Sequence, residues 1–177
     1  MEFLAPFIQI IVGLFSFLLV LRTWLQFCRV DPYMPISQTL MRLTNPVLNP
    51  LSKLIPTVKG INFAALLLAA GIVALQFVLF GVDVPRAVLI GLLSVVKTFG
   101  QILFFTTLIR ALMSWVTQGN HPLDYTVAQI TEPVLGIIRK ILPKTGMLDF
   151  SVMVLGFALL FINSLFYQVF GQLWAVA

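Results

Sequence analysis

The sequence is poor in the residues that catalysis, metal binding and disulfide bonds require. It contains a single cysteine, Cys28, and a single histidine, His121, far apart in the chain. A lone thiol makes no internal disulfide, and neither residue has the neighbours that a zinc site needs. No P-loop, G-x-S-x-G, H-E-x-x-H or glycine-rich dinucleotide motif is present. We therefore predict no catalytic residues, no bound metal and no cofactor, and expect that the protein is not an enzyme.

Charged residues are also scarce, and their signs are unbalanced. They make up 10% of the chain against 60% hydrophobic residues, and the net charge is +5. Soluble domains carry about a quarter charged residues, and a core of this size cannot bury so much apolar surface. The basic residues stand in short clusters between apolar stretches, which fits anionic lipid headgroups better than nucleic acid. We expect a membrane protein that contacts anionic headgroups and binds no nucleic acid.

Long apolar stretches are what the sequence has in excess. About 20 helical residues cross roughly 30 Å of hydrocarbon. Stretches of that order cover residues 3–27, 61–80, 87–115 and 148–174. They are continuous and do not alternate, so they indicate helices and not barrel strands. The first has no basic start and no small-residue cleavage site, which favours a retained span over a signal peptide. We predict an all-α membrane protein with four transmembrane helices.

The placement of lysine and arginine predicts the orientation of these spans. Of the 11 basic residues, all except Arg86 and Lys97 lie in or beside the two long connections, residues 28–60 and 116–147. Loops rich in lysine and arginine stay on the cytoplasmic side. This predicts a multi-pass protein of a bacterial inner membrane, with both termini and the short 81–86 turn on the periplasmic side.

The chain contains an internal repeat. Residues 35–63 align without a gap with residues 122–150, and the preceding segments align so that Arg22 pairs with Arg110. Identical residues in the alignment are Pro35/Pro122, Thr39/Thr126, Thr44/Thr131, Pro46/Pro133, Val47/Val134, Leu48/Leu135, Lys53/Lys140, Pro56/Pro143 and Phe63/Phe150. We predict two repeats, residues 1–84 and 85–177. Each is a helix, a basic loop and a helix, and the two are parallel about an axis along the membrane normal.

Each long loop also carries the pattern of a short amphipathic helix. In the second loop, Thr131 can cap the helix, Pro133 suits its first turn and Pro143 marks its end. Apolar residues fall on one face, with Arg139 and Lys140 at the flank. This pattern is typical of a helix in the headgroup plane. A helix that packs on the ends of the membrane helices, without a lipid role, accounts for it as well.

The first loop repeats this design. Thr44 and Pro46 begin the predicted helix, Lys53 lies at its flank and Pro56 follows its end. Pro50 makes this copy less regular.

Two further sets of residues lie near the ends of the predicted spans. Asn62 and Asp149 match each other at the starts of the second and fourth spans, where both are good helix caps. Trp24, Trp115 and Trp174 lie near span ends, as interfacial anchors do.

The second repeat carries a recognisable motif. It runs through Arg110, Ser114-Trp115, Pro122, Thr131-x-Pro133, Arg139-Lys140, Pro143 and Asp149-Phe150-Ser151. The motif resembles the YggT family, also called YlmG, and the resemblance covers nearly the whole chain as two tandem copies. The first copy departs from it, with Gln26-Phe27 for Ser114-Trp115 and Asn62 for Asp149.

This resemblance implies a cellular context and no common biochemical activity. Members of the family are small membrane proteins of bacteria and plastids. They are linked to osmotic or envelope stress, to cell division and nucleoid placement, and to membrane assembly. A role in potassium uptake has also been suggested for the family.

A set of polar residues falls inside the apolar stretches. Lys97 lies near the middle of the third span, and the repeat places Gln9, Gln76 and Asn163 at similar depths in the other three. Gln101 shares a helix face with Lys97. A lysine at this depth costs a few kcal/mol or more, which makes it a functional hypothesis. The layer either joins the helices by hydrogen bonds, with Lys97 snorkelling or losing its proton, or lines a hydrated path or ion site.

Two functions remain open at this point. The first is an integral membrane scaffold or assembly protein whose basic cytoplasmic loops bind lipid headgroups and a protein partner or a second copy. The alternative is a small ion channel or transporter that uses the polar layer.

Overall fold

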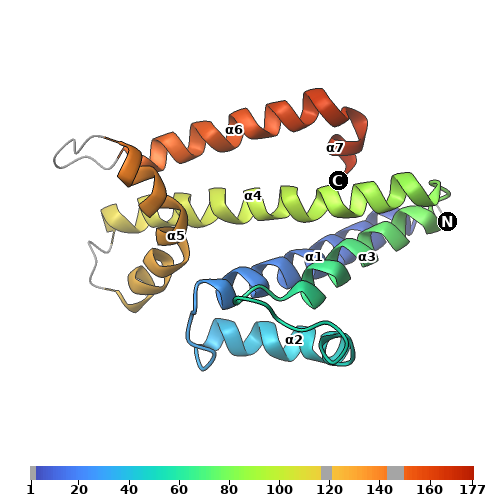
Figure 1. Cartoon of the computed structure of the whole chain (residues 1–177), viewed down its shortest axis with the longest axis horizontal. Helices are drawn as coiled ribbons and strands as arrows, with labels where there is room; N and C mark the ends of the chain where they lie inside the picture. The colour runs from blue at the N-terminus through green and yellow to red at the C-terminus, as the bar shows by residue number, and fades with distance from the viewer. Residues whose placement is uncertain (1–2, 117–120, 143–149) are drawn as a thin grey trace. The chain divides into compact units, whose positions relative to one another are not determined.

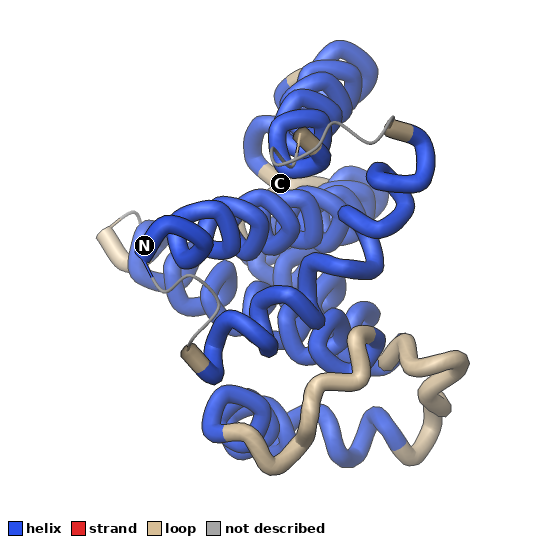
Figure 2. Tube along the Cα trace, turned by 90° about the vertical axis from the view of Figure 1, so that its left-hand side faces the viewer, coloured by secondary structure: helices blue, strands red, loops and turns tan. Residues whose placement is uncertain are grey.

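The structure, a computed structural model, consists of helices joined by loops over the residues it describes, which are 3–116, 121–142 and 150–177 (Figures 1 and 2). The helices are α1 (Ala5–Phe27), α2 (Pro35–Ser52), α3 (Phe63–Leu79), α4 (Val84–Val116), α5 (Pro122–Ile141), α6 (Ser151–Phe170) and α7 (Gln172–Val176). This confirms the all-α class.

Three helices are long and apolar enough to cross a membrane. They are α1, the Val84–Met113 part of α4, and α6. The stretch predicted as the second span corresponds to α3, a shorter apolar helix of 17 residues. At 1.5 Å per residue α3 measures about 26 Å, a little less than the hydrocarbon thickness. Three of the four predicted stretches are therefore helices of membrane-crossing length and composition, and the crossing by four helices stays a prediction.

The described residues form two compact units. The first comprises residues 1–99 and 170–177, and the second comprises residues 100–169. In the first unit α1 packs along α3, and α2 lies against both (Figure 1). Its core is built from aliphatic and alanine side chains. The most enclosed of these are Leu19, Val20, Leu48, Ala64, Ala65, Ala69, Ala87 and Ile90.

Small residues let α3 and α4 approach closely in this unit. A Cβ built on Gly91 of α4 would lie 2.3 Å from the carbonyl oxygen of Ala70 and 3.1 Å from the Cβ of Ala74. Ala87, one turn before Gly91, is fully buried. Such small-xxx-small patterns on both helices are typical of membrane helix pairs.

The second unit holds the end of α4, together with α5 and α6. Ile130, Thr131 and Leu135 form the buried face of α5. His121 caps α5: its Nδ1 accepts a bond from the Leu123 amide (3.2 Å), and its own amide donates to the Asp124 carboxylate (3.0 Å). This capping pair satisfies amides of the first turn, and His121 itself stays exposed just before the helix.

The two loop helices begin earlier than predicted. Thr44 and Thr131 were expected to cap short helices, but α2 starts at Pro35 and α5 starts at Pro122, so both threonines lie in helix interiors. Proline is favoured in the first turn, where its missing N–H has no partner to lose. Pro46, Pro50 and Pro133 lie inside the helices instead of near their starts.

The other helix ends agree more closely with the sequence. The Asn62 side chain caps α3 by accepting from the Ala65 amide (3.0 Å), which confirms that prediction. Asp149 and Pro143 lie outside the described residues. The predicted span of residues 148–174 is wrong at its end: α6 stops at Phe170, and Gly171, with φ 53°, turns the chain into α7. Glycine adopts this left-handed region at little cost.

Candidate functional site

A partly buried arginine in α1 fastens α2 to this apolar helix. Arg22 Nη1 donates to Thr44 Oγ1 (2.5 Å) and to Asn45 Oδ1 (2.7 Å). The Thr44 hydroxyl in turn donates to the carbonyl of Leu40, one turn back in α2 (2.6 Å). The Thr44 hydroxyl thus accepts one bond and donates another, and the guanidinium holds the middle of α2 from the side. We call this arrangement the first clasp.

The second repeat builds the same arrangement from matching residues. Arg110 Nη1 in α4 donates to Thr131 Oγ1 (2.6 Å) and to Glu132 Oε2 (3.2 Å) in α5. The Thr131 hydroxyl donates to the carbonyl of Val127 (2.8 Å). Arg139 adds bonds from Nη1 to both Glu132 oxygens, at 2.9 and 3.0 Å. We call this the second clasp.

The two clasps give a structural role to residues that the repeat matched but did not explain. Arg22 matches Arg110 and Thr44 matches Thr131 in the sequence alignment, yet nothing in the sequence joins each arginine to its threonine. Hydrogen bonds from a charged donor are stronger than neutral ones. Thr44 is fully enclosed and Thr131 nearly so. If the arginine were removed, water could not reach either hydroxyl oxygen to replace the lost hydrogen bond. The clasps therefore fix each loop helix on an apolar helix.

Helix α2 has one packed face, and its remaining surface carries both apolar and basic residues. The face that packs inward carries Ser37, Leu40, Thr44 and Leu48. Beside it runs an exposed line of large apolar side chains, Ile36, Leu43 and Val47, and Leu54 is exposed just beyond the end of the helix. Arg42 is exposed on another side of the helix, and Lys53, the C-cap, is exposed as well. Pro46 and Pro56 are exposed too.

On α5 the exposed surface again combines apolar and basic residues. Ile137 is 59% exposed and Ile141 80% exposed. Lys140 is exposed beside them, while Arg139 is held by Glu132. The side chain of Trp115, predicted as a motif residue, lies outside the described part of the structure.

Lys97 is held by the C-terminal helix. Its Nζ donates to the backbone carbonyls of Trp174 (3.0 Å) and Ala175 (3.1 Å), and it lies 5.8 Å from the centre of the Trp174 ring. Carbonyls at a helix C-terminus carry partial negative charge that favours a cation, and an aromatic face adds to this. Trp174 is buried, as is Trp24, so neither is the exposed interfacial anchor that the sequence predicted.

The other members of the predicted polar layer differ in exposure. Gln76 is buried on α3, whereas Gln9 is exposed on α1. Gln101 and Asn163, in the second unit, are exposed on their helices. The layer as a joint site therefore stays a prediction. Within the described ranges, no three or more histidine, cysteine, aspartate or glutamate residues are grouped as metal ligands.

Known proteins resemble this chain along almost its whole length. A protein of Haemophilus influenzae is 44% identical over 174 residues, which covers 98% of this chain and 96% of that protein. A protein from the proC 3'region of Vibrio alginolyticus is 39% identical over 94% of this chain and 95% of its own length. The protein YggT of Escherichia coli is 37% identical, over 92% of this chain and 88% of its own. No solved structure matches.

The family comparison agrees with the duplicated clasps. The model of the CCB3/YggT family matches the chain twice in tandem, at residues 1–82 and at residues 89–170. Each match includes the arginine–threonine pair of one clasp, Arg22 with Thr44 in the first and Arg110 with Thr131 in the second. This confirms the resemblance that the sequence motif indicated, and the chain belongs to the CCB3/YggT family.

Proposed function

We propose that the protein is a scaffold of the bacterial inner membrane that holds α2 and α5 in the cytoplasmic headgroup layer. There the two helices bind anionic lipid and present a surface to a protein partner or a second copy. Family membership and three helices of membrane-crossing length support the membrane placement. The resemblance to the YggT family supports a role in osmotic or envelope stress and in division.

The observation that carries this proposal is the surface of α2. Residues 36, 43 and 47 are spaced by seven and four, so they form one line along the helix. Their side chains, all large and apolar, are between 46% and 53% exposed although the helix is already packed by another face. Arg42 lies on another side of the helix, and the exposed Lys53 follows the end of the helix. A helix with a free apolar line and basic residues is suited to the boundary between headgroups and acyl chains.

Spin-label accessibility tests the placement of α2. Val47→Cys and Asn49→Cys put a nitroxide on the apolar line and on an exposed polar position of the same helix. In vesicles, we expect the label at position 47 to be relaxed mainly by oxygen, which dissolves in acyl chains. The label at position 49 should be relaxed mainly by a water-soluble nickel chelate. Equal access of the chelate to both positions would contradict the proposal.

A second experiment tests the basic residues. We expect Arg42→Gln with Lys53→Gln to lower the binding of the purified protein to phosphatidylglycerol vesicles, since each basic residue near an anionic surface contributes about 1 kcal/mol. Arg86→Gln is the matched control, because Arg86 pairs with Asp83 in the 81–86 turn. If the double variant also fails to restore osmotic tolerance to a deletion strain, lipid contact is part of the cellular role.

Transport is a second candidate function, and Lys97 is the observation that favours it. An ammonium in the interior of an apolar helix is a common feature of ion and proton pathways. Ion flux through liposomes that contain the purified protein separates transport from scaffolding. A scaffold leaves the flux at the level of empty liposomes.

A further inference from the structure

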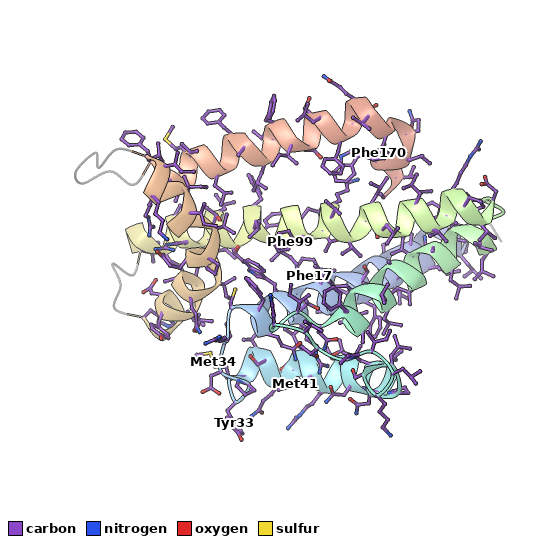
Figure 3. The ribbon with its side chains drawn as sticks, viewed as in Figure 1. Phe17, Tyr33, Met34, Met41, Phe99 and Phe170 are labelled. Atoms are coloured by element: carbon purple, nitrogen blue, oxygen red, sulfur yellow. The ribbon has the colours of Figure 1, made fainter. Side chains whose placement is uncertain are left out.

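The first unit contains an apolar groove between α1, α3 and α4. Its volume is about 310 Å³, within the range of ligand sites, and it is partly open. Its walls are apolar apart from one threonine. The lining residues are Val20, Thr23, Trp24, Phe27, Ile61, Leu66, Val95, Val96 and Phe99. Figure 3 shows Phe99 on the side of α4 that faces α1.

The aromatic walls of this groove are fixed by contacts with each other. The Trp24 ring is stacked on Phe27, with centroids 5.3 Å apart, and meets the edge of Phe99 at 4.9 Å. Trp24 is 7% exposed, so its ring has little room to move. Aromatic pairs of this geometry are stabilising beyond the area that they bury. The groove is therefore a preformed feature of the fold.

Two basic residues with unusual backbone geometry stand beside the groove. Arg29 has φ 56° and Lys59 has φ 52°, and they are the two non-glycine residues with positive φ in the described part of the chain. Arg29 follows the C-cap of α1, a position where glycine is the usual choice. Lys59 and Gly60 are the central residues of a two-residue turn closed by the pair Val58 and Ile61. That turn also favours asparagine or glycine over lysine.

The turn with Lys59 packs directly on the end of α1. A Cβ built on Gly60 would lie 3.6 Å from the Cα of Phe27. Next to it, Asn62 Nδ2 donates to Gln26 Oε1 (3.2 Å). Phe27 and Ile61 line the groove, and Arg29 and Lys59 are each two residues away from one of them. Both basic residues are exposed. The groove and the two positive charges therefore lie at the same end of α1.

We propose that this groove and the two basic residues form a binding site for one anionic phospholipid. One acyl chain lies in the groove, and the phosphate is bound by Arg29 and Lys59. The lining belongs to apolar helices, so the groove opens to acyl chains and not to water. Residues with strained backbone conformations cluster at functional sites. A phosphate ligand would explain why arginine and lysine occupy two positions that are suited to glycine. The site rests on the membrane placement proposed above, but not on α2 lying in the headgroup layer.

Native mass spectrometry of the full-length protein in detergent tests the site. Phosphatidylglycerol, phosphatidylcholine and inorganic phosphate are added in separate titrations. We expect one tightly bound phosphatidylglycerol, binding of phosphatidylcholine roughly tenfold weaker, and no competition from inorganic phosphate. Arg29→Gly with Lys59→Gly should weaken phosphatidylglycerol binding by roughly tenfold or more. Because glycine relieves the positive φ, this variant should unfold at an equal or higher temperature.

A second variant tests the groove separately from the charges. Val96→Phe fills the groove from an exposed position on α4, and Leu92→Phe adds the same ring at an exposed position that does not line it. We expect loss of the bound lipid with Val96→Phe alone. Equal binding in both variants, or equal binding of the two lipids, overturns the proposal. A changed oligomeric state of Val96→Phe with unchanged lipid binding also overturns it, and assigns the groove to a second copy. The spin-label result for α2 is independent of these outcomes.

Discussion

Gly91 shows at the scale of one residue how tightly the first unit is packed. The atom that a Cβ would meet at 2.3 Å is a backbone oxygen, the Ala70 carbonyl, which cannot rotate away. We expect Gly91→Ala to lower the free energy of unfolding by about 1–3 kcal/mol, the usual cost of overpacking. Thermal unfolding in detergent measures this. Gly71→Ala on α3 is the control, because nothing lies within 4 Å of its Cβ position. A stable Gly91→Ala protein would show that α3 and α4 are further apart.

Cys28 gives a pH-dependent prediction. Burial raises the pKa of its thiol from 9.0 to about 12. Since only the thiolate reacts, we expect alkylation in the folded protein to be about 1,000-fold slower at pH 8 than for an ordinary thiol. The rate should keep rising between pH 9 and pH 11, whereas a cysteine introduced at exposed position 49 should level off. A plateau near pH 9 for Cys28 would contradict the burial.

The same shift has a consequence for stability. The unfolded chain loses the thiol proton at a lower pH than the folded protein does. Deprotonation above pH 9 therefore favours the unfolded state, and this contribution reduces stability progressively as the pH rises from 9 toward 12. Below pH 9 both states keep the proton, and the thiol makes no difference.

Single residues were predictable where their role depends on local sequence. The cap at Asn62 follows from a polar residue before an apolar stretch, and the structure confirms it. Thr44 and Thr131 looked like caps for the same reason, but the proline at each earlier helix start outweighed that signal. The partners of Lys97 could not be predicted, because backbone carbonyls of a distant helix leave no mark in the sequence. The arginine–threonine pairs were visible as repeat matches, but only folding brings them together.

At the scale of elements, the first clasp is expected to hold α2 in place. Thr44→Val keeps the shape of the side chain and removes the acceptor of Arg22. We expect the free energy of unfolding to fall by about 1.5–3 kcal/mol, as for hydrogen bonds with a charged partner. Amide hydrogen exchange across residues 35–52 should speed up as well. Thr39→Val is the matched control, because the Thr39 hydroxyl also bonds one turn back, to Pro35 (2.8 Å), but is exposed. Equal effects of the two substitutions would exclude the clasp.

The short helix α7 depends on a different contact. Lys97→Met removes both bonds to the Trp174 and Ala175 carbonyls while keeping the length of the side chain. We expect the amides of Trp174, Ala175 and Ala177, which are bonded within α7, to exchange at least tenfold faster. Lys97→Arg retains donors and should keep the slow exchange. Unchanged exchange in Lys97→Met would mean that burial of Trp174 alone holds α7.

The positions of the apolar helices could be predicted better than the ends of the helices. Apolar stretches located α1, α3, α4 and α6 to within a few residues, because a membrane-crossing helix needs a continuous apolar surface. The end of α6 was missed, since the residues after Gly171 are apolar as well and only backbone geometry separates α7. The loop helices were predicted too short, because an interior proline such as Pro133 resembles a helix start.

At the scale of the whole molecule, the number of crossings depends on α3. Its 17 residues span about 26 Å. A bilayer adapts to a short span by thinning, at fractions of a kcal/mol per Å of mismatch. The length of α3 therefore does not prevent a crossing. The sequence of α3 is apolar and contains no charged side chain. Lipid is therefore the most favourable environment for this helix.

Site-directed labelling from one side of the membrane decides this. The test positions are Asn49→Cys in α2, Asp83→Cys in the turn before α4 and Lys140→Cys in α5, all exposed. If α3 crosses, an impermeant maleimide labels positions 49 and 140 from the same side and position 83 from the other. If α3 does not cross, positions 49 and 83 share a side and position 140 lies opposite, because α4 still separates them. We expect the first pattern, since both repeats carry their basic residues in the loop between the two helices. Labelling after permeabilisation is the control, and the buried Cys28 gives a low background.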